Sequence, residues 1–204
     1  MDTGVTNQKR DFLQASSVLA ESLMDNPFYW SISDDFGFEV TARKQVLTRY
    51  FQYSLEEAER TGRCIVAPGA TLGAAAWLLP RHPDIEAAES AAKSRYLGTV
   101  LGPRGMENYH RIVRFMSPLA SRAVPPGAWY LSIVGVLPSA RGRGLGASLL
   151  VGTLEEASRS EVPCYLETFT PRNMTFYERL GFHAVANHLE PTTNREYVVM
   201  RKDR

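Results

Sequence analysis

Apolar residues along this chain follow two spacings, and each spacing predicts a different kind of element. Helical spacing, with breaks at Asp25-Asn26-Pro27 and at later prolines, predicts helices over about Arg10–Met24, Thr41–Arg60, Ile85–Tyr96 and Met106–Met116. Short apolar runs predict strands over Arg63–Ala67 and Thr71–Leu79, which a turn at Pro68-Gly69 would join as a hairpin.

The second half of the chain alternates strands with helices. A strand, a glycine-rich loop and a helix are predicted over about Trp129–Ser158, followed by a strand over Cys164–Phe169 and a short helix over Pro171–Leu180. Two further strands are predicted over His183–Leu189 and Glu196–Arg201. This order predicts an α/β fold of the α+β type, with a mixed sheet and helices on both faces, and the 204 residues suit one domain.

Three adjacent aromatic residues, Phe28, Tyr29 and Trp30, follow the first predicted helix. They cannot all face one way on a helix or a strand, so they either line a pocket or lid or pack an irregular loop in the core. Together with Trp77 in the predicted hairpin, they are the candidate substrate-binding residues.

The stretch from Ser132 to Ala147 has the composition of an anion-binding loop. An apolar run ends at Pro138, three glycines then alternate with Arg143 and Leu145, and an amphipathic helix follows. Glycines let backbone N–H groups turn toward a ligand, and the first N–H groups of a helix have no internal partner. Arg141 and Arg143 add guanidinium groups that can bind phosphate, so the loop is predicted to hold a diphosphate.

The motif around this loop narrows the choice of phosphate ligand. There is no Gly-Lys-Ser/Thr of a P-loop, and the spacing Gly142, Gly144, Gly146 departs from the dinucleotide fingerprint. Arg141-x-x-Gly144-x-Gly146, preceded by Val-x-Val-x-Pro, resembles the signature of GNAT-superfamily N-acetyltransferases. The resemblance implies a mostly antiparallel sheet splayed at an acetyl-CoA site. It also implies acetyl-CoA as co-substrate, held by Val134, Val136, Arg141, Gly142, Arg143, Gly144, Leu145, Gly146 and Ala147. The chain has no Cys/His ligand spacing, so no metal is expected.

A second motif lies in the short helix that follows the next strand. Asn173 and Tyr177, four residues apart, share one face, and Gly181-Phe182 ends the helix. This pattern also resembles GNAT enzymes, and over about residues 128–182 the likeness is greatest to puromycin N-acetyltransferases. It implies that Asn173 binds the pantetheine arm and that Tyr177 protonates the departing thiolate.

The catalytic base is less well defined by the sequence. Glu167, at the end of a predicted strand, is one candidate, and a chain of water molecules is the alternative. His110, His183 and His188 are weaker candidates. The backbone N–H of Val136 would hold the oxyanion. The likeness is loose over residues 1–127, the expected acceptor-binding half, whereas residues 128–204 form the expected acetyl-CoA-binding and catalytic half.

Composition excludes several other functions. A net charge of +1 gives no reason to expect nucleic acid or an anionic membrane as a partner. No apolar run reaches about 18 residues, and residues 1–10 lack a signal-peptide pattern. Cys64 and Cys164 lie in separate apolar runs without metal-ligand spacing, which favours two thiols in a reducing cytoplasm over a disulfide, and no basic partner marks Cys164 as a nucleophile.

Three functions remain open at this point. The chain could acetylate the amine of a small molecule, such as an antibiotic or aminonucleoside. It could instead acetylate a protein or peptide, or it could hold acetyl-CoA as a non-catalytic sensor. The sequence leaves both a monomer and a homodimer possible.

Overall fold

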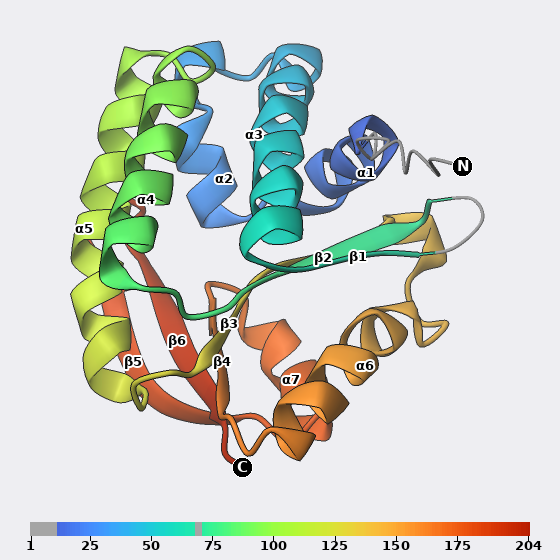
Figure 1. Cartoon of the computed structure of the whole chain (residues 1–204). Helices are drawn as coiled ribbons and strands as arrows, with labels where there is room; N and C mark the ends of the chain where they lie inside the picture. Colours follow the sequence, from blue (N-terminus) through green and yellow to red (C-terminus); the bar gives the residue numbers. More distant parts are fainter. Residues whose placement is uncertain (1–11, 68–70) are drawn as a thin grey trace, which may run out of the picture.

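A mixed sheet lies between two layers of helices in the computed structural model, which describes residues 12–67 and 71–204 (Figure 1). The strands are β1 (Gly62–Val66), β2 (Gly73–Leu78), β3 (Trp129–Val136), β4 (Cys164–Thr168), β5 (His183–Glu190) and β6 (Arg195–Lys202). They pair in the order β1-β2-β3-β4-β6-β5, and only β3 and β4 are parallel. The expected mixed, mostly antiparallel sheet is therefore confirmed.

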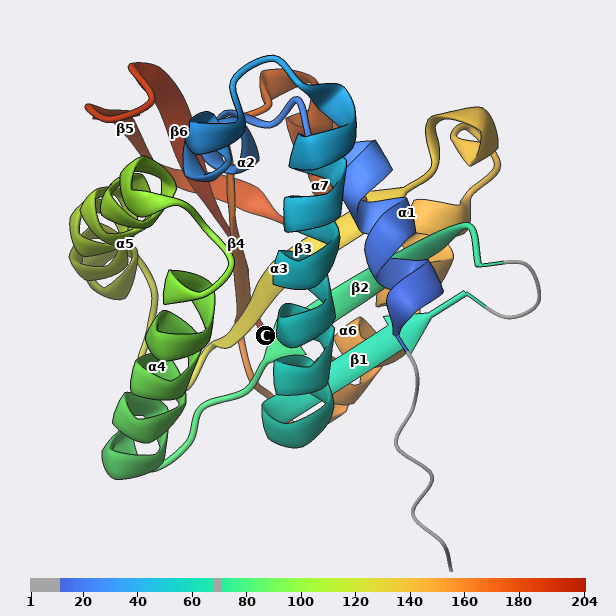
Figure 2. The same ribbon diagram turned by 90° about the horizontal axis from the view of Figure 1, so that it is seen from above.

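Helices cover both faces of this sheet. Figure 2 shows α1 and α3 lying across β1–β3, with α6 beneath the same strands, and α4 and α5 standing to one side. Their bounds are α1 (Leu13–Leu23), α2 (Pro27–Ile32), α3 (Val40–Thr61), α4 (Pro83–Gly98), α5 (Pro103–Ala123), α6 (Leu145–Arg159) and α7 (Met174–Arg179). None of the described helices is long and apolar enough to cross a membrane.

Strand β2 runs through the centre of the core. Its side chains alternate between the two faces: Ala74 and Ala76 pack with α1 and α3, whereas Ala75 and Trp77 pack with the apolar face of α6. Trp77 is completely buried in that second cluster. A strand covered on both faces is apolar throughout, as the sequence of β2 is.

A β-bulge in β3 opens the sheet beside β4. Opposite β2, Ala76 pairs with Ile133 and Trp77 with Leu131, so Ser132 is the extra residue. Bulges bend a strand and end its pairing on one side. Accordingly, β3 pairs with β4 only at Trp129 and Tyr130, and the two strands are unpaired from the bulge onward. This is the splay that the resemblance implied.

Several boundaries differ from the sequence-based expectation. Residues 25–33 do not form an irregular loop, because the Asn26 side chain accepts a hydrogen bond from Phe28 N (2.9 Å) and caps α2. Pro83 and Pro103 are the first residues of α4 and α5, where a backbone N–H would have no partner within the helix in any case. Both helices therefore start earlier and are longer than predicted. The expected start at Arg10 and the turn at Pro68-Gly69 lie outside the described residues.

Candidate active site

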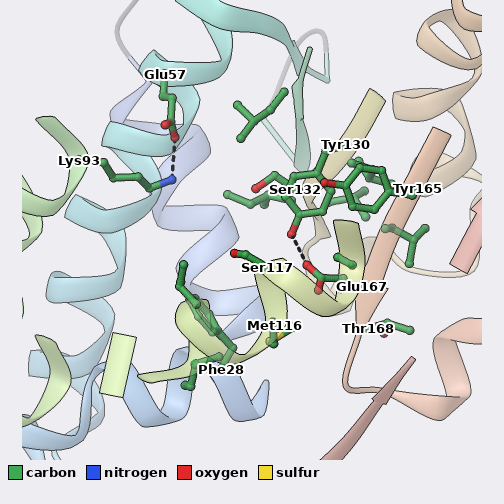
Figure 3. A pocket seen from close by; sticks show the side chains of 18 of the residues that line it. Phe28, Glu57, Lys93, Met116, Ser117, Tyr130, Ser132, Tyr165, Glu167 and Thr168 are labelled. Carbon is green, nitrogen blue, oxygen red and sulfur yellow. Dashed lines mark hydrogen bonds and ion pairs between the residues drawn. The ribbon is translucent and has the colours of Figure 1, made fainter. Parts of the chain in front are cut away.

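A cavity of about 560 Å³ lies beside the gap between β3 and β4 (Figure 3). One wall comes from the splayed strands and α7, and the other from α2, α3, α4 and α5. Both halves of the chain therefore contribute to it. A volume of this size suits a small organic molecule.

Glu167 of β4 lies on the wall of this cavity. Its Oε2 accepts a hydrogen bond from the Tyr130 hydroxyl (3.0 Å), and its Oε1 is buried without a hydrogen-bond partner among the described residues. Burial raises the pKa of Glu167 to about 7, and the hydrogen bond from Tyr130 opposes that rise. A carboxyl group with this pKa can accept a proton at neutral pH and has one oxygen available to do so.

Tyr177 and Asn173 enter the same cavity from the short helical segment after β4. Asn173 ends a single 3-10 turn (Pro171–Asn173), and Tyr177 lies one turn further along, in α7. Gly181 then leaves the helix with φ +90°, as its position predicts. Burial raises the pKa of Tyr177 to about 12, so its phenol stays protonated and can donate a proton or a hydrogen bond.

The glycine-rich loop presents a run of unpaired backbone amides. Gly142 and Gly144 have φ of +76° and +77°, which orient the chain so that Gly144 becomes the N-cap of α6. The six N–H groups from Gly142 to Ala147 donate to no acceptor in the described part of the chain. Consecutive free amides at a helix N-terminus form an anion-binding surface.

The edge of β3 continues this surface toward the cavity. Leu137 N donates to Leu72 O on the β2 side. Because N–H groups alternate along a strand, those of Val136 and Val134 point to the opposite edge, where β4 has diverged. That edge can accept an extended ligand as an additional strand.

The two arginines of the loop have different surroundings. Arg141 donates to Ser22 O (3.0 Å) and Val136 O (3.3 Å), and its own N–H reaches Pro138 O, so it fastens the loop to α1 and β3. The exposed Arg143 guanidinium makes no hydrogen bond or ion pair with any described residue.

Gly146 has a packing role, because a Cβ there would lie 3.2 Å from the ring of Phe176 in α7.

The aromatic candidates separate into two groups. Phe28 and Tyr29 line the cavity, whereas Trp30 and Trp77 do not. Trp30 is 40% exposed and lies over the Arg43 guanidinium (3.6 Å from the ring centroid). Trp77 packs in the core under α6, as its alternation along β2 requires.

The other sequence candidates lie away from the cavity. His110, His183 and His188 do not line it. Burial raises the pKa of the Cys164 thiol to about 11, which opposes a nucleophilic role. Among the described residues, no group of three or more His, Cys, Asp and Glu side chains could hold a metal ion.

Sequence analysis missed two features of the cavity. Tyr130 sits in a plain apolar run, and only the parallel register beside Tyr165 brings its hydroxyl to Glu167. Glu57 and Lys93 also line the wall and form an ion pair, although charged residues on helices usually face solvent. No local pattern in the sequence distinguishes them from surface residues.

Comparison with known proteins supports the fold described above. Residues 106–184 match the family model described as an acetyltransferase (GNAT) domain. The chain is similar to a solved structure from Corynebacterium glutamicum described as histone acetyltransferase HPA2 and related acetyltransferase (TM-score 0.62, 23% identity, 95% of this chain and 91% of that chain).

Two further solved structures share the fold at lower identity. Arylalkylamine N-acetyltransferase 2 from Aedes aegypti matches with a TM-score of 0.60 at 13% identity, over 94% of each chain. An agmatine N-acetyltransferase matches with a TM-score of 0.57 at 15% identity, over 96% of this chain and 97% of that chain. The expected GNAT fold is therefore confirmed.

The hydrogen bond from Tyr130 generates a prediction about Glu167. Because this bond stabilises the carboxylate, Tyr130→Phe should raise the pKa of Glu167 above about 7. The measurement is a pH titration of the Glu167 carboxyl carbon by NMR in the intact chain.

Tyr165→Phe is the matched control, because Tyr165 stacks on Tyr130 (ring centroids 4.7 Å apart) without a hydrogen bond to Glu167. In Tyr165→Phe the pKa of Glu167 should stay unchanged. An unchanged or lowered pKa in Tyr130→Phe would contradict the assigned hydrogen bond.

Proposed function

We propose that this protein transfers an acetyl group from acetyl-CoA directly to the amine of a small molecule. The observation that carries the proposal is the joint position of Glu167 and Tyr177 on one cavity, beside the opened edge of β3. The Glu167 carboxylate can accept a proton, and the Tyr177 hydroxyl can donate one. A non-catalytic acetyl-CoA sensor would need neither.

The free backbone groups of the chain suit acetyl-CoA. Its pyrophosphate would lie on the amides from Gly142 to Ala147, with the unpaired Arg143 guanidinium nearby. Its pantetheine arm would pair with Val134 and Val136 as an extra strand, and Asn173 would bind the same arm from α7's side. Arg141 would contribute by holding the loop in place through Ser22 O and Val136 O.

The proposed mechanism has no acyl-enzyme. The neutral amine attacks the thioester carbon, and the backbone N–H of Val136 stabilises the resulting oxyanion. Glu167 takes the proton that the amine loses, directly or through one water molecule. The C–S bond then breaks, Tyr177 donates its proton to the sulfur, and the proton held by Glu167 returns to the phenolate through solvent.

The shape of the cavity favours a small acceptor over a protein. Its walls come from helices as well as the sheet and include the rings of Phe28, Tyr29, Tyr50 and Tyr109. Aromatic walls bind a compact apolar group well. The likeness of residues 128–182 to puromycin N-acetyltransferases supports an aminonucleoside or antibiotic as the acceptor.

Location and assembly follow separate reasoning. We place the protein in the cytoplasm because Cys64 and Cys164 lie in separate apolar runs of the sequence, as expected for thiols in a reducing compartment. We assign no nucleic acid, membrane or metal to the proposed reaction. The chain could work as a monomer or a homodimer.

Replacing Gly144 tests the proposed diphosphate site. A valine at φ +77° is strained, so Gly144→Val should reorient the free amides and weaken acetyl-CoA binding about tenfold or more, as measured by calorimetry. Gly37→Val is the matched control: it has φ +53°, with no atom within 4 Å of an added Cβ, and does not line the cavity. Equal affinities in both variants would refute the site.

Replacing Glu167 tests the base. Because only the carboxylate accepts a proton, kcat/KM of the wild type should rise with pH through about 7 and then level off. Glu167→Gln should lower kcat/KM by about 100-fold or more and remove that rise. The assay needs an acceptor whose own amine pKa lies well below the tested range.

The control for this experiment is Glu178→Gln, which changes an exposed carboxylate next to Tyr177. It should keep both the rate and the pH profile. If Glu167→Gln keeps the rise near pH 7, water and not Glu167 is the base.

Replacing Tyr177 tests the acid. Tyr177→Phe should reduce kcat by about 100-fold while acetyl-CoA affinity stays nearly constant, because only the hydroxyl is lost. Tyr53→Phe, outside the cavity, should have no effect. Full activity in Tyr177→Phe would remove the phenol from the mechanism.

A further inference from the structure

The cavity has a second polar pair, far from Glu167. Lys93 Nζ of α4 lies 2.6 Å from Glu57 Oε2 of α3, and only 11% and 9% of the two side chains is exposed. Both residues line the cavity. Figure 3 shows this pair and the Tyr130–Glu167 pair on opposite sides, with Ser117 between them and Phe28 below.

The Lys93 ammonium has hydrogen-bonding capacity that Glu57 does not use. An ammonium carries three N–H donors, and in the described part of the chain Glu57 is its one hydrogen-bond acceptor. Burial alone lowers the pKa of Lys93, but Tyr50 and Glu57 raise it above its ordinary value, so the side chain remains charged at neutral pH. The wall therefore offers N–H donors to a ligand.

The charges around Lys93 determine which ligand group it suits. Glu57 already neutralises the ammonium at contact distance, and the carboxylates of Glu86 and Glu89 line the same side of the cavity. Lining cations are fewer, namely Arg81 and Lys93. Glu89 is itself paired with Arg60 (3.1 Å). An anionic group beside Lys93 would be repelled by Glu57 at the same ammonium, whereas a neutral carbonyl oxygen would accept a second N–H of Lys93 without that repulsion.

Besides polar groups such as Ser117 and Ser132, the cavity is lined by aromatic and aliphatic side chains. These include Phe28, Tyr50, Tyr109, Ile112 and Met116. Phe28 meets the rings of Tyr50 (6.2 Å) and Tyr109 (6.3 Å) edge-on, which fixes these walls in place. An acceptor that fills the cavity would thus have an apolar middle and two polar ends.

We propose that the Glu57–Lys93 pair binds the distal end of the acceptor, through a neutral carbonyl or amide oxygen that accepts a hydrogen bond from Lys93. The substrate class is then a primary amine joined by an aromatic or apolar spacer to a neutral hydrogen-bond acceptor. This inference rests on the proposed acetyl transfer at Glu167, and it assigns Lys93 a role in acceptor specificity.

Three matched amines test this role: phenethylamine, its para-carboxamide and its para-carboxylate. For the wild type, kcat/KM should be about tenfold higher for the carboxamide than for phenethylamine, mainly through KM, and lowest for the carboxylate. This ranking needs no variant, so it does not depend on whether a substituted cavity folds.

A double variant then assigns the preference to the pair. Lys93→Met combined with Glu57→Gln removes both charges and leaves neither one unpaired in the cavity wall. The preference for the carboxamide over phenethylamine should disappear, while the KM for acetyl-CoA stays constant. Lys44→Met with Glu21→Gln is the control, since that exposed pair has a similar separation of 2.7 Å, and it should keep the preference.

The outcomes separate this inference from the proposed function. Equal kcat/KM for the three amines, or a preference that survives in the double variant, would overturn the role of Lys93 and leave acetyl transfer standing. If none of the amines is acetylated, calorimetric binding in the presence of CoA decides. Tighter binding of the carboxamide by the wild type than by the double variant supports the inference, and equal or absent binding overturns it.

Discussion

The β-bulge at Ser132 is the constraint on which the site depends. Parallel neighbours in a sheet normally satisfy each other's N–H and C=O groups along their whole length. Here the extra residue bends β3, pairing with β4 stops after Tyr130, and the edge carrying Val134 and Val136 is left open. An open edge inside a sheet needs another partner. In the proposed reaction that partner is the pantetheine arm of the co-substrate.

The divergence of β3 and β4 also brings the side chains of Glu167 and Tyr177 to the gap between the strands. Glu167 lies on the strand that turns away, and its partly buried carboxyl group keeps one hydrogen bond, from Tyr130. Tyr177 follows one short helix later and reaches the cavity from the side of α7. The proposed proton acceptor and proton donor thus come from neighbouring elements of the chain. In the proposed reaction, the helices of the first half form the other wall of the cavity and select the acceptor.

The sequence predicted the local features well and the long-range ones poorly. The motifs at Gly142–Ala147 and Asn173–Tyr177 each lie within a few consecutive residues, where spacing along the chain largely fixes geometry, although Asn173 ends a 3-10 turn and Tyr177 lies in α7. By contrast, Trp77 was placed at the substrate although strand alternation buries it under α6. The bulge at Ser132, the Tyr130–Glu167 bond and the Glu57–Lys93 pair join residues from different elements, so they depend on register and packing that no local pattern encodes.

The most direct test of the opened edge is an amide NMR titration of the intact chain with CoA. The account predicts saturable shifts that share one binding curve at Val134, Val136 and the residues from Gly142 to Ala147, with little change in β1 or at the end of α6. Shifts confined to other regions, or no saturable shift along β3, would contradict it.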